Sequence, residues 1–230
     1  MKRFYKNVDL GEQDGGYVIL LDGRAVKTPE RRLVMAPNQD LADSLAQEWR
    51  DQGEDVLPRT MPMNKYLCTA IDRVATQRES LIEELVGYGG SDQICYRAEH
   101  PADLVSRQQE VWDPIVKWMG KEMGIFLKTT SGIIHVEQER AEMDKLRRLL
   151  AVLNEFEIAA LHNMTTLTGS VSIGMALLHD RIDLDRAWAA SQLDEEYQIE
   201  QWGQDKEAEE RRANMREELG HAARFLSLVR

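Results

Sequence analysis

The strongest constraint on the fold of this chain is a change of hydrophobic period near residue 38. Upstream of it, the apolar run at residues 17–21 and the run at 24–28 flank an Asp22-Gly23 pair. An Asp-Gly pair between two β-prone runs predicts a β-hairpin, because both central turn residues need positive φ. Downstream, apolar residues recur three or four positions apart, which is the period of an α-helix. The chain is therefore expected to combine a small hairpin-rich sheet with a longer helical part.

The first helix is predicted to begin at Asn38, whose side chain can cap it. Its apolar line runs through Leu41, Leu45 and Trp49, and Gly53 is the expected stop. A link with two prolines follows at residues 58–62. We place a domain boundary there, which gives an N-terminal α/β domain over residues 1–62 and a helical domain over 63–230.

The helical part is expected to hold several helices. Asp113-Pro114 resembles an N-cap followed by proline at the first helical position, so one helix should end there and another begin. Residues 125–137 are ambiguous between strands and an extended loop. Ser170 and Gly174, four apart among apolar residues, predict a closely packed buried helix. The remaining helices are expected at about 140–162, at 184–202 after Asp183, and at 206–228 after Asp205.

Composition excludes several function classes. A net charge of −11 leaves no basic excess to neutralise phosphates, which argues against a general nucleic-acid binder or an anionic-membrane binder. No apolar run approaches the ~20 residues that a membrane-spanning helix needs. The basic N-terminus lacks the apolar core of a signal peptide, so we expect a cytosolic or already processed protein.

Motifs for catalysis are absent. The sequence contains neither G-x-x-x-x-G-K-[ST] nor G-x-G-x-x-G, and no G-x-S-x-G elbow. Its five histidines are scattered singly. Cys68 and Cys95 are expected to be buried, reduced thiols in a reducing compartment. No catalytic, cofactor-binding or metal-ligating residue is therefore predicted.

The stretch "LDEEYQIEQWG" at residues 193–203 combines four carboxylates with two large aromatic residues. At about 100° per residue, one face of the helix carries Leu184, Trp188, Ile199 and Trp202, with Glu195 in its middle. Leu193 and Tyr197 lie on the opposite side. Asp194 and Gln198 lie at the edges of the apolar stripe, and Glu196 points between the two apolar faces.

Glu195 is thus a charge where the pattern favours an apolar residue, and three interpretations compete. It could pair with an arginine or lysine inside the core, since a buried charge must be paired. It could be the centre of a surface that docks a partner, where tryptophan and tyrosine are favoured. It could also be a catalytic carboxylate whose pKa is raised by apolar neighbours.

Seven segments in this order resemble one known family. They are "YVILLDGRAVKTP", "LAQEWRDQG", "MPMNKYLCTAIDRV", "SDQICYRA", "WDPIVKW", "GSVSIGMAL" and "LDEEYQIEQWG". Together they resemble the assembly chaperones specific for the α subunit of the F-type ATP synthase catalytic head, the ATP synthase mitochondrial assembly factor 2-like family. The missing transit sequence favours its alphaproteobacterial type.

The resemblance implies a small N-terminal α/β domain followed by an all-α orthogonal helical bundle, an α+β fold. It implies a cytoplasmic, non-enzymatic chaperone (in the mitochondrial matrix for eukaryotic relatives), expected to be a monomer without cofactors. Such a chaperone would bind the unassembled ATP synthase α subunit, shield its β-facing surface from aggregation and hand it over for assembly. The alternatives are a small acid/base hydrolase that uses Glu195 and a general holdase. The expected partner-binding residues are Glu195, Glu196, Gln198, Trp202, Trp188 and Asp194, whereas Trp49 is expected to be structural.

Overall fold

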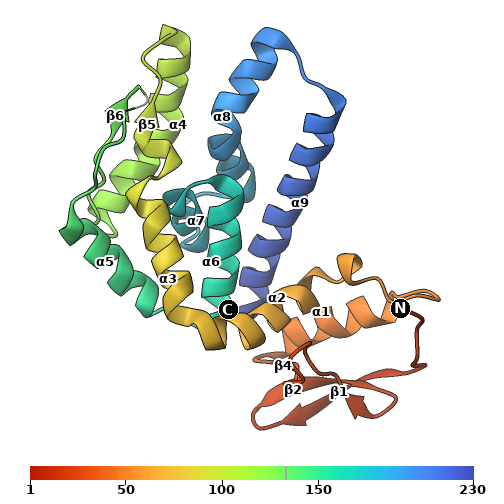
Figure 1. Cartoon of the computed structure of the whole chain (residues 1–230). Helices are drawn as coiled ribbons and strands as arrows, with labels where there is room; N and C mark the ends of the chain where they lie inside the picture. Colours follow the sequence, from red (N-terminus) through yellow and green to blue (C-terminus); the bar gives the residue numbers. More distant parts are fainter. Residues whose placement is uncertain (133) are drawn as a thin grey trace. The chain divides into compact units, whose positions relative to one another are not determined.

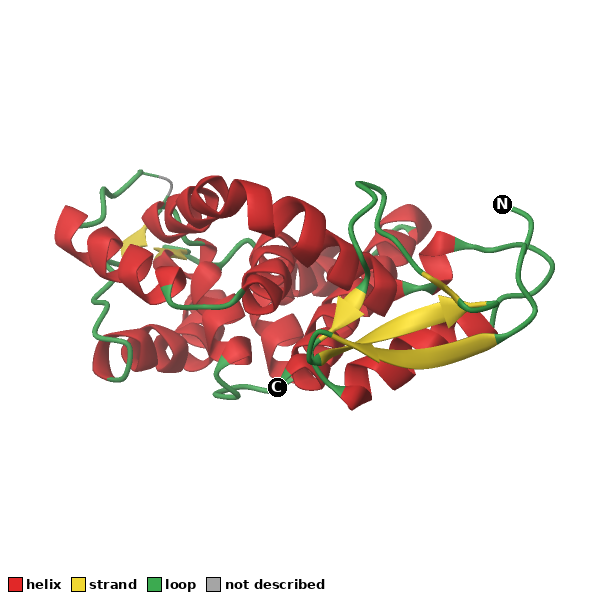
Figure 2. Ribbon diagram, turned by 90° about the horizontal axis from the view of Figure 1, so that it is seen from below, coloured by secondary structure: helices red, strands yellow, loops and turns green. Residues whose placement is uncertain are grey.

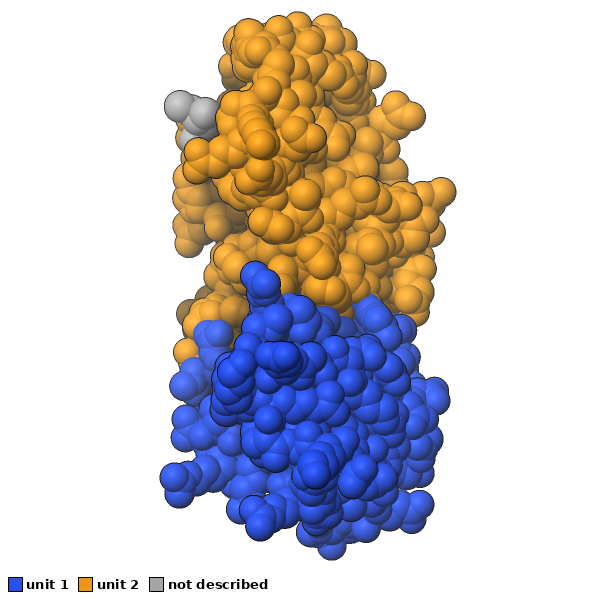
Figure 3. Space-filling view, turned by 90° about the vertical axis from the view of Figure 1, so that its right-hand side faces the viewer, with its two compact units in different colours: residues 1–78, 154–160, 224–230 blue, residues 79–153, 161–223 orange. Residues whose placement is uncertain are grey.

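The chain folds into two compact units, which a computed structural model describes over residues 1–132 and 134–230. Unit 1 consists of residues 1–78, 154–160 and 224–230, and unit 2 of residues 79–153 and 161–223 (Figure 3). A small antiparallel sheet lies near the N-terminus and a helical bundle follows it, so the predicted α+β class is confirmed. The division into residues 1–62 and 63–230 stays a prediction; each compact unit contains more than one segment of the chain.

Two Asp-Gly turns shape the sheet of unit 1, drawn in yellow in Figure 2. At Asp22-Gly23 both φ angles are positive (47° and 79°), and Asp14-Gly15 has the same geometry (51° and 82°). These angles match the type I′ turn, whose twist suits flanking strands, and the predicted hairpin is confirmed. Strand β2 pairs antiparallel with each of the other strands: β2 is Gly16–Leu21, and its partners are β1 (Val8–Gln13), β3 (Arg24–Ala25) and β4 (Met35–Ala36).

Helix α1 (Gln39–Arg50) packs against this sheet. Asn38 is its N-cap, and the Asn38 Oδ1 accepts a hydrogen bond of 2.9 Å from the Leu41 backbone N–H. Leu41 and Leu45 are fully buried, as the apolar line predicts. The helix ends before the expected stop at Gly53. Three short helical segments follow in the order η1 (Pro58–Thr60), α2 (Pro62–Thr69) and the π-helical η2 (Ala70–Val74).

Helices dominate the chain from residue 75 onward (Figure 1). None of them, within the described residues, is long and apolar enough to cross a membrane. A two-stranded parallel sheet joins β5 (Tyr96–Arg97) and β6 (Thr130–Ser131), and a 3₁₀ turn, η3 (Gln93–Cys95), precedes it. The helices are α3 (Ala75–Gly90), α4 (Ala102–Lys121), α5 (Arg140–Ala151), α6 (Glu155–Thr168), α7 (Val171–Leu178), α8 (Leu184–Trp202) and α9 (Lys206–Val229).

Helix α7 is the buried element of unit 2, since all eight of its residues are buried. The Ser170 Oγ caps it by accepting a 3.0 Å hydrogen bond from the Ile173 N–H. Asp92, itself fully buried, accepts a 2.9 Å bond from the Ser172 N–H and a 3.2 Å bond from the Ile94 N–H. Burial raises the pKa of the Asp92 carboxyl and these donors lower it, with burial the larger effect. Helix α7 contacts α4 and α8, so it positions both.

The prediction that a helix ends at Asp113 is wrong. Helix α4 continues through Pro114, although proline removes one backbone hydrogen bond of the helix. Trp112 on one side and Ile115 and Trp118 on the other are buried, and this packing holds the helix together. Asp113 does not act as a cap; its carboxylate pairs with Arg97 at 3.2 Å and with Lys117 at 3.3 Å.

The ambiguous segment 125–137 is mostly irregular in its described part, and its only regular element there is β6. Residue 133 lies outside the described residues. Elsewhere the predicted helices are confirmed: the region 140–162 contains α5 and the start of α6, and the last two helices follow Asp183 and Asp205, as expected.

Gly174 allows α7 to approach α6 closely. A Cβ at Gly174 would lie 2.9 Å from Leu161 Cδ1 and 2.9 Å from Thr165 Oγ1, closer than real Cβ atoms approach. The close packing predicted from Ser170 and Gly174 is therefore confirmed.

We predict that Gly174→Ala destabilises the protein. Overpacking costs about 1–3 kcal/mol, and the better helix propensity of alanine returns up to about 1 kcal/mol. Urea denaturation should show a net loss of about 1 kcal/mol or more. Gly87→Ala in α3 is the matched control, because a Cβ at Gly87 meets no atom within 4 Å; it should stabilise by about 0.5–1 kcal/mol. Equal effects of the two changes would contradict the packing argument.

Candidate functional site

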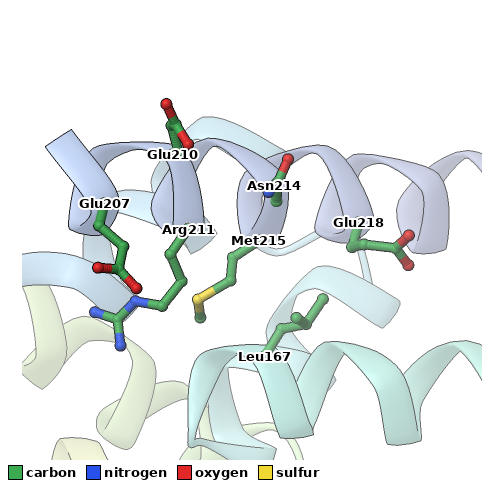
Figure 4. Close-up of a pocket in the computed structure, with 7 residues that line it drawn as sticks. All are labelled: Leu167, Glu207, Glu210, Arg211, Asn214, Met215 and Glu218. Atoms are coloured by element: carbon green, nitrogen blue, oxygen red, sulfur yellow. The ribbon is translucent and has the colours of Figure 1, made fainter.

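Three of the six predicted partner-binding residues, Asp194, Glu195 and Gln198, line one open groove of unit 2. It has two contiguous parts, with volumes of ≈ 610 Å³ and ≈ 420 Å³, which share Leu167, Arg211 and Met215. We call it the α8–α9 groove. In Figure 4, Met215 points from α9 toward Leu167 of α6, whereas Glu210 and Glu218 point away from them. The remaining lining residues are Gln93, Thr166, Thr168, Gly169, Ser191, Gln192, Asp194, Glu195, Gln198, Glu207 and Asn214.

Glu195 lines this groove and pairs with Arg211. The Arg211 Nη2 lies 3.1 Å from the Glu195 Oε1, and the Arg211 and Glu195 side chains are 64% and 33% exposed, respectively. The carboxylate is therefore paired, as one interpretation proposed, but at the wall of an open groove rather than inside the core. A partly hydrated pair can be exchanged for a pair with another molecule at little cost.

Glu196 and Trp188 meet a different arginine, Arg212. The Arg212 Nη2 donates to the Glu196 Oε1 at 3.0 Å, its Nε donates to the Gln192 Oε1 at 3.2 Å, and its guanidinium lies 5.9 Å from the Trp188 ring centre. The Arg212 side chain is only 13% exposed, and Trp188 is buried. The arrangement joins α8 to α9, and Trp188 takes part in it as a buried residue rather than a surface residue.

Asp194 is fixed by a buried glutamine of α4. The Gln108 Nε2 donates a 2.7 Å hydrogen bond to the Asp194 Oδ1, while the Gln108 Oε1 accepts the Ala98 N–H at 2.8 Å. Gln108 is 1% exposed. The Trp112 Nε1–H, also on α4, donates to the Ala190 carbonyl at 2.8 Å. These bonds hold the middle of α8 in place.

Gln198 and Trp202 lie toward the end of α8 and are exposed, Trp202 to 79%. Gln198 lines the groove and Trp202 does not. The helix ends after Trp202 at Gly203, whose φ of 82° suits glycine. The exposed indole offers a large apolar area to a partner at low rotamer entropy.

The helical-wheel stripe is only partly reproduced, because the two ends of α8 have different surroundings. Trp188 faces the core near the start of the helix, and Trp202 faces solvent at its end. Leu193 and Tyr197, on the opposite side, are both buried. A periodic pattern reports which residues share a face and does not report how far the neighbouring helices extend along it.

The sequence did not identify the residues that α6 and α9 contribute to the groove. The buried apolar residues of α9 are Leu219, Ala222, Phe225 and Leu226. The next large apolar residue toward the start of the helix is Met215. Met215 continues the apolar side of α9 into a charged segment, and this is the sequence feature that could have identified α9 as part of the groove.

Neither a metal centre nor an activated thiol is found in the part of the chain that the structure describes. No group of three or more His, Cys, Asp or Glu side chains there could hold a metal ion. Both cysteines are free. Burial raises the pKa of Cys95 to about 12 and that of Cys68 to about 11, and the charges of Asp92 and Asp72 add to these shifts.

Comparisons with known proteins agree on one family. The model of the ATP12 chaperone protein matches residues 2–120. The chain is 27% identical over 221 residues to the protein atp12, mitochondrial, of Schizosaccharomyces pombe, covering 91% of this chain and 76% of that protein. It is 38% identical to Atp12 from Paracoccus denitrificans, whose crystal structure gives a TM-score of 0.95 and covers 100% of this chain and 98% of that one. The Atu1473 protein of Agrobacterium tumefaciens is also 38% identical, with a TM-score of 0.94 over 100% of this chain and 86% of that one.

We predict that the two ion pairs of α8 differ in their contribution to stability. Glu195→Ala should lower the free energy of unfolding by less than about 1 kcal/mol, because its pair with Arg211 is partly exposed. Arg212→Ala should cost about 2–3 kcal/mol, since it removes charge-assisted bonds from a mostly buried side chain. Urea denaturation of both variants measures the difference. A large loss in Glu195→Ala would place that carboxylate in the core.

We also predict slow thiol modification of the native protein. With a pKa of about 11, Cys68 at pH 8 has roughly one hundredth of the thiolate fraction of a thiol at the ordinary value of 9.0. Cys95, which is fully buried, should react more slowly still. Iodoacetamide labelling followed by mass spectrometry should show little reaction at pH 8 and modification of both residues in urea. Fast labelling of native Cys95 would contradict its burial.

Proposed function

This chain belongs to the ATP12 chaperone family, and from that premise we propose that it acts in assembly of the F-type ATP synthase. Its client would be the newly made α subunit, whose β-facing surface it would cover until the β subunit takes its place. A subunit that awaits its neighbour exposes apolar surface, which makes it prone to aggregate. A chaperone of this kind needs no catalytic group.

The observation that carries this proposal is the α8–α9 groove. Leu167 and Met215 supply apolar contact area, and methionine adapts its shape to different partners. Carboxylates surround them, among them Glu195 and Glu207. Such a groove suits an apolar client surface that bears basic residues.

We propose that Glu195, Asp194 and Gln198 contact the client in the groove and that the exposed Trp202 contacts it beyond the groove. Glu196 does not line the groove and, with Trp188, would act by holding α8 against α9 through Arg212. In the client complex, a basic side chain of the client would replace Arg211 as the partner of Glu195. Because the pair is partly hydrated, this exchange costs little, and the complex can be released.

The proposal includes action as a monomer, without a cofactor, in the bacterial cytoplasm. The mitochondrial relative from Schizosaccharomyces pombe is consistent with the corresponding compartment in eukaryotes.

The test is co-purification of ATP synthase α subunit, expressed without β, with this chain as bait. We predict a soluble complex that dissociates when β is added. Glu195→Lys should weaken capture at least tenfold, because it places a cation where a client cation would bind. Its melting temperature should stay within a few degrees of the original.

Glu209→Lys is the matched control. It makes the same charge change on an exposed residue of α9 that does not line the groove, and it should leave capture unchanged. Aggregation of α in the presence of the chain would refute the proposal. Equal protection of α and of heat-treated citrate synthase would indicate a general holdase instead.

A further inference from the structure

Unit 1 contains a second groove, distinct from the α8–α9 groove of unit 2. Its volume is ≈ 640 Å³, within the range of pockets that bind small ligands or side chains of a peptide. Apolar side chains form most of its surface: Val26, Pro29, Trp49, Val56, Pro58 and Met61. We call it the Trp49 groove.

The walls of the Trp49 groove are held by hydrogen bonds within unit 1. The Trp49 Nε1–H donates to the Asn64 Oδ1 at 3.0 Å, and the Asn64 Nδ2 in turn donates to the Glu48 carboxylate at 2.8 Å. Trp49 also packs edge-on against Tyr5, with ring centres 5.6 Å apart. An indole fixed in this way offers apolar surface without a further loss of rotamer entropy on binding.

A second part of the groove is also held by hydrogen bonds. The Asp72 carboxylate accepts a 2.7 Å hydrogen bond from the Thr28 hydroxyl and a 3.1 Å bond from the Glu30 N–H. Arg32 donates to the Ile71 carbonyl at 2.6 Å. Asp72 lies in the π-helical turn η2, and π-turns occur frequently at functional sites. The groove is therefore preformed and does not depend on a bound partner for its shape.

The rim of the Trp49 groove has the opposite charge balance to the rest of the chain. Lys27, Lys65 and Arg73 line it, against the carboxylates of Glu30 and Asp72. The chain as a whole carries a net charge of −11. A cationic rim around apolar walls favours an apolar ligand with carboxylates beside it.

We propose that the Trp49 groove binds an extended apolar segment of a client polypeptide that carries Asp or Glu next to its apolar residues. This inference rests on the proposed function only in taking the occupant to be a polypeptide. Grooves with an aromatic wall accept proline-containing extended peptides, whose preformed polyproline II conformation needs little ordering on binding. The chain then has two client sites with opposite charge preferences, one in each unit.

Two fluorescein-labelled hexapeptides test the groove on the full-length chain by fluorescence anisotropy. One is Asp-Leu-Pro-Leu-Phe-Asp and the other has lysine at both ends. The acidic peptide should bind more tightly. The double variant Lys27→Glu/Lys65→Glu should weaken its binding by about tenfold, since two attractive charges become repulsive. Lys6→Glu/Lys121→Glu makes the same charge change at exposed sites outside the groove and should have no effect.

Thiol protection locates the bound peptide. Cys68 lines the groove, whereas Cys95 is fully buried elsewhere, so the acidic peptide should slow maleimide labelling of Cys68 and leave that of Cys95 unchanged. Equal binding of both peptides, an equal loss in the two double variants, or unprotected Cys68 would overturn the inference.

The test of the Trp49 groove and the test of the proposed function can fail independently of each other. Glu195→Lys, in unit 2, should retain binding of the acidic peptide even where it loses capture of the α subunit. If α is not captured but the peptide binds in the Trp49 groove, the proposed client is wrong and the groove stands. If α is captured and the peptide does not bind, the inference about the groove is wrong.

Discussion

The contact of Arg212 with α8 is the interaction on which the α8–α9 groove depends. The groove has α8 as one wall and α9 as another, and Arg212 joins them through Glu196, Gln192 and the face of Trp188. Gln108 and Trp112 hold the other side of α8 through Asp194 and the Ala190 carbonyl. With both sides fixed by mostly buried groups, Glu195 and Gln198 are left at an open surface whose shape does not collapse.

Much of the fold could be predicted, because the signals that determine it are local. Asn38, Asp183 and Asp205 each cap a helix through a hydrogen bond to a backbone N–H three residues later, so a short stretch of sequence contains both partners. The Asp22-Gly23 turn is local in the same sense, and Asp14-Gly15 carries an identical signal for the first hairpin. The helix boundary predicted at Pro114 was wrong, because the burial of Trp112 and Trp118 overrides the local preference of proline for a helix start.

The site was harder to predict, since its geometry depends on contacts between distant residues. The pattern of α8 shows Glu195 among apolar residues, but its partner Arg211 lies on the next helix, 16 residues away. The nearly ninefold difference in exposure between Trp188 and Trp202, 9% and 79%, depends on where α9 and α4 cover α8. Helical periodicity does not show how much of α8 the neighbouring helices cover, so the sequence pattern made the two tryptophans look equivalent.

Two grooves of opposite charge balance would resolve a conflict in what a chaperone for an assembly subunit must do. It has to hold an aggregation-prone client firmly, yet release it to the proper neighbour. A single tight site satisfies only the first need. Two weak sites on one chain bind with an effective concentration set by the chain that joins them, so the overall affinity exceeds that of either site.

A competing subunit that displaces the client from the α8–α9 groove alone removes this gain and leaves only the weak contact in the Trp49 groove, from which the client dissociates quickly. Release then needs no nucleotide, because the arriving partner supplies the free energy.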